Sequence, residues 1–197
     1  MPRLPFEVGR GMGTGPGSTA DTIRGSGVPI RELRRDARAL ARSEFEERYG
    51  RAFLLLSAAE VSAAPPAITE VRLEGDSLRA RAESTAGLSL VVYAVRRNGR
   101  SASHLITVGR APDNDVVVPD VSISRFHAFV KEGNGGRWLM QDAGSTNGTT
   151  VNGNSVPRQG HGPPSELASG DDVRLGQVEL TFLDSEALVS FALRLER

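Results

Sequence analysis

The chain has 197 residues, and its 24 basic and 24 acidic side chains give a formal net charge of zero. No overall basic field therefore exists to collect nucleic acid, so we expect no nucleic-acid partner. The absence of cysteine excludes disulfides and thiolate metal sites. The three histidines show no metal-ligand spacing, and we expect neither a metal nor a cofactor.

The sequence predicts no secretion signal and no membrane anchor. The N-terminus lacks the long apolar core of a signal peptide. The most apolar run, residues 52–64, is too short to span a bilayer and contains Glu60. We therefore expect a cytoplasmic protein without a membrane partner.

The first two segments of the chain differ in character. Residues 1–29 are rich in glycine, proline, serine and threonine, and we predict a disordered tail because so little apolar surface cannot offset the entropy of ordering. In residues 30–64 the apolar side chains recur at spacings of three and four, which predicts an amphipathic helical segment, with Gly50 as a candidate break. The residues on its apolar face are Ile30, Leu33, Ala37, Leu40, Ala41, Phe45 and Tyr49.

This helical segment has two interpretations. It binds a partner or a second copy of the chain, or it packs on its own domain and leaves its arginines in solvent. Amphipathic helices usually serve a core, so we favour the second interpretation. Pro65 and Pro66 then end the helix. Residues 65–87 are predicted as a linker that contains a short hairpin around Glu74–Ser77.

From residue 88 onward, short apolar runs alternate with turn residues, which predicts a β-sandwich or barrel. The predicted strands are 90–95, 116–118, 126–130, 138–140, 173–175 and 178–182. Gly176 and Gln177 suit a two-residue turn between the last two strands. Residues 185–195 are predicted to form a terminal helix, with Leu188, Phe191 and Leu195 toward the sheets.

Three short signals occur in a fixed order within residues 108–150. They are Gly109-Arg110, then Ser124-Arg125-Phe126-His127, then Gly144-Ser145-Thr146-Asn147-Gly148-Thr149. Together, at these separations, they resemble the forkhead-associated (FHA) domain, a module that binds phosphothreonine peptides. The resemblance extends over residues 88–197, taken as the domain, and implies an eleven-strand β-sandwich with binding loops at one end.

The resemblance also implies roles for individual residues. Phosphate contacts would come from Arg110, Ser124, Arg125 and Thr146, and Asn147 would hold the peptide backbone. His127 would fix the loop that carries Ser124, while Gly109 and Gly148 would permit close turns. A phosphothreonine carries about −1.5 to −2 charge and three acceptor oxygens, which forked guanidinium groups, hydroxyls and backbone N–H groups match.

Other interpretations of these residues are weaker. Ser124 and His127 also suggest a nucleophile and its base, but no G-x-S-x-G elbow surrounds the serine. Phe126 stands where bacterial members of the family often carry a basic residue, which affects residue preference beyond the phosphothreonine.

From the resemblance we predict a non-catalytic phosphothreonine-dependent adaptor whose partner is a Ser/Thr kinase or its substrate. The alternative is a scaffold or oligomerisation protein that uses the N-terminal helix and carries a degenerate FHA fold.

Overall fold

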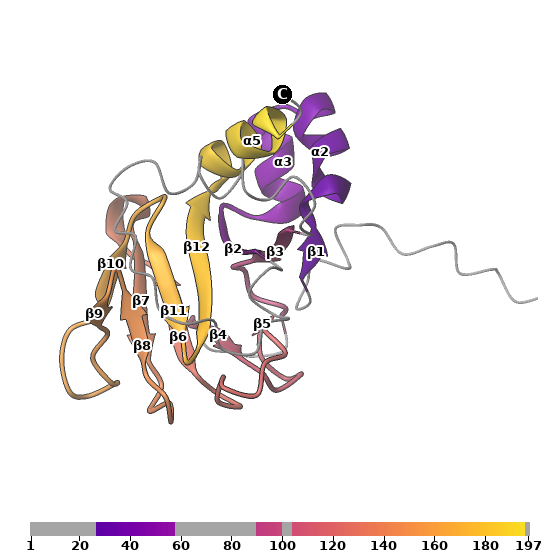
Figure 1. Cartoon of the computed structure of the whole chain (residues 1–197). Coiled ribbons are helices and arrows are strands. Elements are labelled where there is room, and N and C mark those ends of the chain that lie inside the picture. Colours follow the sequence, from indigo (N-terminus) through magenta and orange to yellow (C-terminus); the bar gives the residue numbers. More distant parts are fainter. Residues whose placement is uncertain (1–26, 58–89, 100–103, 196–197) are drawn as a thin grey trace, which may run out of the picture.

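The structure is a computed structural model that describes residues 27–57, 90–99 and 104–195. Two β-sheets pack face to face, and three helices cover the outer face of one of them (Figure 1). The larger sheet has the strand order β1 (Val28–Pro29), β3 (Leu90–Ala94), β2 (Ala52–Ser57), β12 (Val178–Asp184), β11 (Asp172–Leu175), β8 (Thr149–Val151) and β9 (Asn154–Ser155). The smaller sheet has the order β10 (Ser165–Leu167), β7 (Trp138–Asp142), β6 (Ala128–Glu132), β4 (Ile106–Gly109) and β5 (Val116–Val117).

This arrangement confirms the predicted β-sandwich. Neighbouring strands are antiparallel except for β4 and β5, which pair in parallel. The described residues contain twelve strands rather than eleven, because β1 adds a short strand beside β3. The turn at Gly176 and Gln177 joins β11 to β12 as predicted, since Leu175 pairs directly with Val178.

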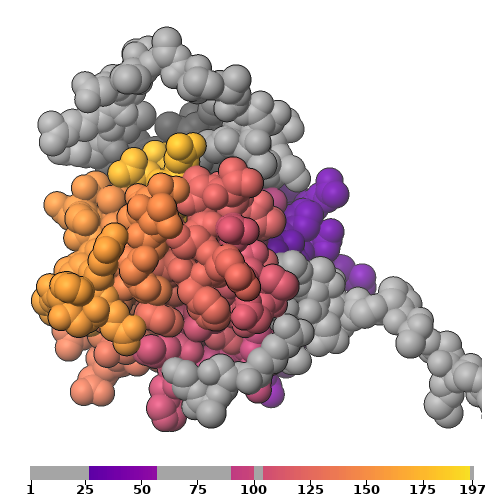
Figure 2. Space-filling view, turned by 90° about the horizontal axis from the view of Figure 1, so that it is seen from below, coloured from indigo at the N-terminus to yellow at the C-terminus, as the bar shows by residue number. Residues whose placement is uncertain are grey.

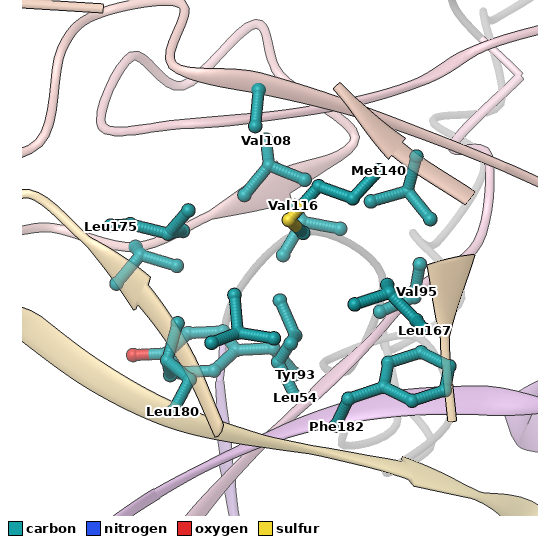
Figure 3. Packing of buried hydrophobic residues seen from close by; sticks show 14 of the residues in the cluster. Leu54, Tyr93, Val95, Val108, Val116, Met140, Leu167, Leu175, Leu180 and Phe182 are labelled. Carbon is teal, nitrogen blue, oxygen red and sulfur yellow. The ribbon is translucent and has the colours of Figure 1, made fainter. Parts of the chain in front are cut away.

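The main core lies between the two sheets. Figure 3 shows how side chains from both sheets meet there, including Val108 and Met140 from the smaller sheet and Leu54 and Phe182 from the larger one. These side chains come from alternate positions of each strand, which is the period-2 pattern of a strand with one face toward the core.

A second core fills the space between the larger sheet and the helices α2 (Ile30–Ala39), α3 (Arg42–Tyr49) and α5 (Ser185–Arg194). Leu33, Phe45 and Tyr49 from the N-terminal helices pack here with Phe53 of β2 and Leu188 of α5. The helical segment therefore packs on its own domain, as the favoured interpretation predicts. Figure 1 shows the three helices gathered at one end of the larger sheet.

The predicted helix over residues 30–64 is wrong for residues 52–57, and residues 58–64 lie outside the described residues. Ala52–Ser57 is strand β2, which pairs with β3 on one side and β12 on the other. Its run of apolar residues has no alternation, because one face packs on the second sheet and the other on the helices. A strand buried on both faces cannot be told from a buried helix by periodicity alone. The break between the helices is also earlier than predicted, at Leu40 and Ala41, where Ala41 is exposed.

These findings move the boundaries predicted from the sequence. The sandwich does not begin at residue 88, because β2 is one of its central strands and β1 pairs at the edge of the same sheet. The predicted disordered tail ends earlier, since Val28 and Pro29 pair with β3. Residues 1–26 and the hairpin predicted within residues 65–87 lie outside the described residues. In the part of the chain that is described, no helix is long and apolar enough to cross a bilayer.

Candidate functional site

The predicted site residues lie in loops at the end of the sandwich away from the helices. The loop after β4 carries Arg110, the loop between β5 and β6 carries Ser124 and Arg125, and the loop after β7 carries Thr146 and Asn147. Figure 2 views the molecule from this end, where the pink to orange segments that hold these loops lie side by side. The structure thus brings together the residues that the sequence separates by almost forty positions.

Gly109 lets the first two loops approach each other at their backbones. A Cβ atom on Gly109 would lie 2.2 Å from the carbonyl oxygen of Arg125, so no larger residue fits without moving a loop. The close approach allows the Arg110 N–H to donate to the Ser124 carbonyl at 3.1 Å, and the Ala111 N–H to donate to the Arg125 carbonyl at 3.3 Å. Arg110 is therefore fixed beside Ser124 through its backbone.

The guanidinium groups of Arg110 and Arg125 are exposed. Among the described residues, neither group has a hydrogen-bond or ion-pair partner, whereas other exposed arginines such as Arg42 and Arg48 are paired with carboxylates. Two forked cations at a loop end are thus available for an anionic ligand. A planar guanidinium can engage two oxygens of one phosphate.

His127 is fully buried and joins two of the loops. Its Nδ1 accepts the backbone N–H of Ser124 at 2.9 Å, so the proton of the neutral ring is on Nε2, which donates to the Gly148 carbonyl at 3.1 Å. Burial lowers the pKa of His127, while the Gly148 hydrogen bond and the charge of Asp142 oppose this shift. Both ring nitrogens are therefore occupied by backbone groups, and neither is free to take a proton from the Ser124 hydroxyl.

Ser124 and Thr146 form a pair across two loops. The Thr146 N–H donates to the Ser124 Oγ at 3.0 Å, and the two hydroxyl oxygens lie 3.4 Å apart. Asn147 is anchored nearby, because its Nδ2 donates to the Ser122 carbonyl at 2.8 Å. The Ser124 loop and the Thr146 loop thus present hydroxyl and amide groups next to each other at the surface.

Asp142 supports the third loop and was not identified from the sequence. Its carboxylate accepts the N–H groups of Gly144 and Ser145 and the hydroxyls of Ser145 and Thr149, at 2.6 to 2.8 Å. Burial acts to raise the pKa of Asp142, but the hydroxyl and backbone donors together bring it below its usual value. The aspartate thus holds the turn that presents Thr146 and Asn147.

Asn114 is a second supporting residue that the sequence reasoning missed. Its buried Nδ2 donates to the carbonyls of Ala111 and Arg125, which ties the Arg110 loop to the Ser124 loop. A sequence signal existed for both supports. Asp142 precedes Gly144 and Ser145, and Asn114 lies between Asp113 and Asp115, and such clusters often bond to the backbone of their own turn.

The assembled site suits the capture of an anion. It offers two unpaired guanidinium groups, two hydroxyls and an amide, all supplied by exposed or half-exposed residues of three loops. Hydrogen bonds from such donors to a charged oxygen are stronger than hydrogen bonds between neutral groups. Within the described residues no group of three or more histidine, aspartate or glutamate side chains is arranged to hold a metal ion.

Comparison with known proteins identifies the part of the chain that carries these loops. Residues 106–176 match the family model of the FHA domain. This part of the chain is an FHA domain. It contains every predicted site residue, from Gly109 to Gly148.

In two mycobacterial proteins, the region similar to this FHA domain makes up less than half of the protein. The glycogen accumulation regulator GarA of Mycolicibacterium smegmatis is 40% identical over 77 residues, which cover 39% of this chain and 44% of the regulator. An ABC transporter ATP-binding/permease protein of Mycobacterium tuberculosis is 37% identical over 110 residues, which cover 53% of this chain and 12% of the transporter. The chain thus spans less than half the length of these relatives. A solved FHA domain from Chlamydia trachomatis has a TM-score of 0.41 and 26% identity, and the alignment covers 68% of this chain and 97% of that domain.

Replacing His127 with alanine is expected to lower the free energy of unfolding of the FHA domain. The change removes the acceptor of the Ser124 N–H and the donor to the Gly148 carbonyl, and an unsatisfied buried group costs about 1 to 3 kcal/mol. Urea titration of the two proteins measures the difference. Exposed His161 supplies the control, since His161→Ala should leave the unfolding midpoint unchanged. An unchanged midpoint for His127→Ala would count against the structural role.

The same pair of proteins tests the protonation state of His127. The pKa of His127 is lowered in the folded state, so the unfolded chain binds the proton more readily. The stability that neutral His127 contributes is complete above the unfolded pKa of about 6.5 and is lost as the pH falls from there toward the folded pKa. The difference in unfolding free energy between wild type and His127→Ala should therefore shrink below pH 6.5. A difference that stays constant down to pH 5 would contradict the buried neutral tautomer.

Proposed function

We propose that this chain is a non-catalytic cytoplasmic adaptor that binds phosphothreonine peptides through the loops of its FHA domain. The observation that carries the proposal is that the loops with the two unpaired arginines are hydrogen-bonded to each other and to the loop that completes the Ser124–Thr146 pair. Each element fits one need of a phosphothreonine, which brings two negative charges or nearly so and three acceptor oxygens. Asn147, anchored on the Ser122 carbonyl, supplies an exposed amide for the peptide backbone beside it.

The partner in this proposal is a protein phosphorylated on threonine, either a Ser/Thr kinase or one of its substrates. Since the formal net charge of the chain is zero, long-range attraction contributes little to binding such a partner. Affinity then depends on local charge-assisted hydrogen bonds, each worth roughly 1.5 to 3 kcal/mol. The similarity to GarA, a glycogen accumulation regulator, supports a regulatory role for this chain.

The rival hypothesis is a scaffold that uses the N-terminal helices and carries a degenerate FHA domain. Two observations weigh against it. The apolar face of α2 and α3 is already buried against the sandwich through Leu33, Phe45 and Tyr49, so it is not free to receive a partner helix. The chain also carries the four ligand-binding residue types that the FHA resemblance implies, at Arg110, Ser124, Thr146 and Asn147, whereas a degenerate domain would usually have lost at least one.

A pair of peptide libraries tests the proposal. Both carry a fixed threonine among degenerate neighbours, phosphorylated in one library and unmodified in the other. The full chain, immobilised on beads, is expected to retain phosphorylated peptides and to release the unmodified ones. Retention should fall when inorganic phosphate is added, since the free ion competes for the same donors. Equal retention of the two libraries would refute phosphothreonine reading and would favour the scaffold.

A further inference from the structure

The loop that carries Ser124 presents two large apolar side chains to solvent. Val121 is 97% exposed and Phe126 is 48% exposed. Within the described residues the one other exposed large apolar side chain is Leu193, which lies on α5 and not in a loop of the site. A lone exposed apolar residue needs no explanation, but two in one loop, on either side of Ser124 and Arg125, form a candidate contact surface.

The exposure of Val121 is fixed by the loop around it. The neighbouring residues Val118 and Ile123 are buried, so the loop is anchored on both sides of Val121. Between these anchors, the Asp120 carboxylate accepts the backbone N–H and the hydroxyl of Ser122, at 2.8 and 2.6 Å, and the Ile123 N–H donates to the Asp120 carbonyl. The turn therefore points a β-branched apolar side chain outward from a hydrogen-bonded frame.

Both apolar residues are adjacent to groups that belong to the proposed phosphothreonine site. Val121 precedes Ser122, whose carbonyl holds the Asn147 amide. Phe126 follows Arg125, whose carbonyl accepts the N–H of Ala111, the residue next to Arg110. Val121 thus lies next to the residue that anchors Asn147, and Phe126 follows Arg125, whose backbone is bonded beside Arg110.

We propose that Val121 and Phe126 form an apolar rim beside the phosphate donors, and that the ligand is a phosphothreonine segment with aliphatic or aromatic side chains close to the phosphothreonine. The inference rests on the proposed function of the same site. Apolar side chains of the ligand would remove Val121 and Phe126 from water, which favours association roughly in proportion to the apolar area buried. The hydrogen-bond donors recognise the phosphate in any sequence, and the rim selects among phosphorylated segments.

Two phosphothreonine peptides that differ only around the phosphothreonine provide the test. One carries leucine at the positions within three residues on both sides, the other carries serine there, and each has an unphosphorylated counterpart. Calorimetric titration of the full chain is expected to show tighter binding of the leucine peptide by at least about fivefold, because hydrophobic contacts of about one methylene already discriminate tenfold or more. Val121→Ser and Phe126→Ser should each reduce this preference without removing the dependence on phosphate.

Leu193→Ser is the matched control, because it removes an exposed apolar side chain away from the loops and should leave the preference intact. Equal affinity of the wild type for the leucine and serine phosphopeptides would overturn the apolar rim while leaving phosphothreonine binding in place. A preference that survives in both Val121→Ser and Phe126→Ser would also overturn it. Binding that does not depend on phosphorylation would instead refute the proposed function.

Discussion

A chain that starts at residue 88 is expected not to fold, although it contains the whole segment that matches the FHA family. The missing strand β2 lies in the middle of the larger sheet and pairs with β3 on one side and β12 on the other. Without β2, both neighbours lose a hydrogen-bonded partner, and the core between the sheets loses Leu54 and Leu56. Each buried leucine side chain is worth about 1.5 to 3 kcal/mol, and a whole domain is stable by only about 5 to 15 kcal/mol.

Thermal unfolding followed by circular dichroism checks this expectation on three fragments. Residues 27–197 keep every described element and should unfold at the temperature of the full chain. Residues 52–197 keep every strand of the sandwich except β1 but expose Phe53, Leu55 and Leu183, which the helices α2 and α3 help to cover. This fragment should therefore be less stable or aggregate. Residues 88–197 should show no cooperative transition. A cooperative transition of that shortest fragment near the full-chain temperature would contradict the assignment of β2 to the sandwich.

The strands after residue 90 could be predicted because their side chains alternate and their turns are marked. In β12, for example, Val178, Leu180 and Phe182 face the core while Glu179 faces solvent. Gly176 adds a second signal, since it adopts a positive φ of 64° and approaches the Ser122 carbonyl where a Cβ would clash. Local pattern and tertiary structure agree at such positions, and sequence reasoning succeeds there.

Strand β2 could not be predicted because its neighbours decide its structure. Phe53 and Leu55 face the helices, and Leu54 and Leu56 face the other sheet. The sequence shows only an apolar run that follows two helices. Its strand partner β3 begins at Leu90, beyond a long intervening segment, so no short hairpin turn marks the pairing. The pairing of β1 with β3 could not be predicted either, because Val28 and Pro29 are too few residues to show an alternating pattern.

The candidate site also combines residues that could be predicted from the sequence with contacts that could not. The residues proposed to touch the ligand could be named because their motifs resemble those of the FHA family, which implies their roles. Among the supporting residues, His127 was named through the resemblance, but its bond to the Gly148 carbonyl, twenty-one positions away, was not. The bond from Asn114 to the Arg125 carbonyl could not be predicted either, because it joins two different loops. Asp142 was accessible in principle, since its partners Gly144, Ser145 and Thr149 follow it directly along the chain.

Replacing Arg110 with alanine is expected to lower the affinity for a phosphothreonine peptide by at least about tenfold, or roughly 1.4 kcal/mol. The guanidinium has no partner among the described residues, so its hydrogen-bonding capacity is available to the phosphate. Stability should change little, because the bond that ties residue 110 to the Ser124 carbonyl comes from the backbone N–H and remains in the variant. Calorimetric titration and thermal unfolding measure the two quantities separately.

Arg110→Lys and Arg137→Ala separate the shape of the guanidinium from charge in general. The lysine variant keeps the positive charge but loses the planar fork, so it should recover only part of the affinity. Arg137 is exposed and lies just before β7, at the opposite end of the sandwich from the loops, so its removal should leave the affinity unchanged. Equal losses for Arg110→Ala and Arg137→Ala would mean that net charge governs binding. Full recovery by lysine would mean that Arg110 acts as a point charge. It would refute the hypothesis that the guanidinium contacts two oxygens of the phosphate.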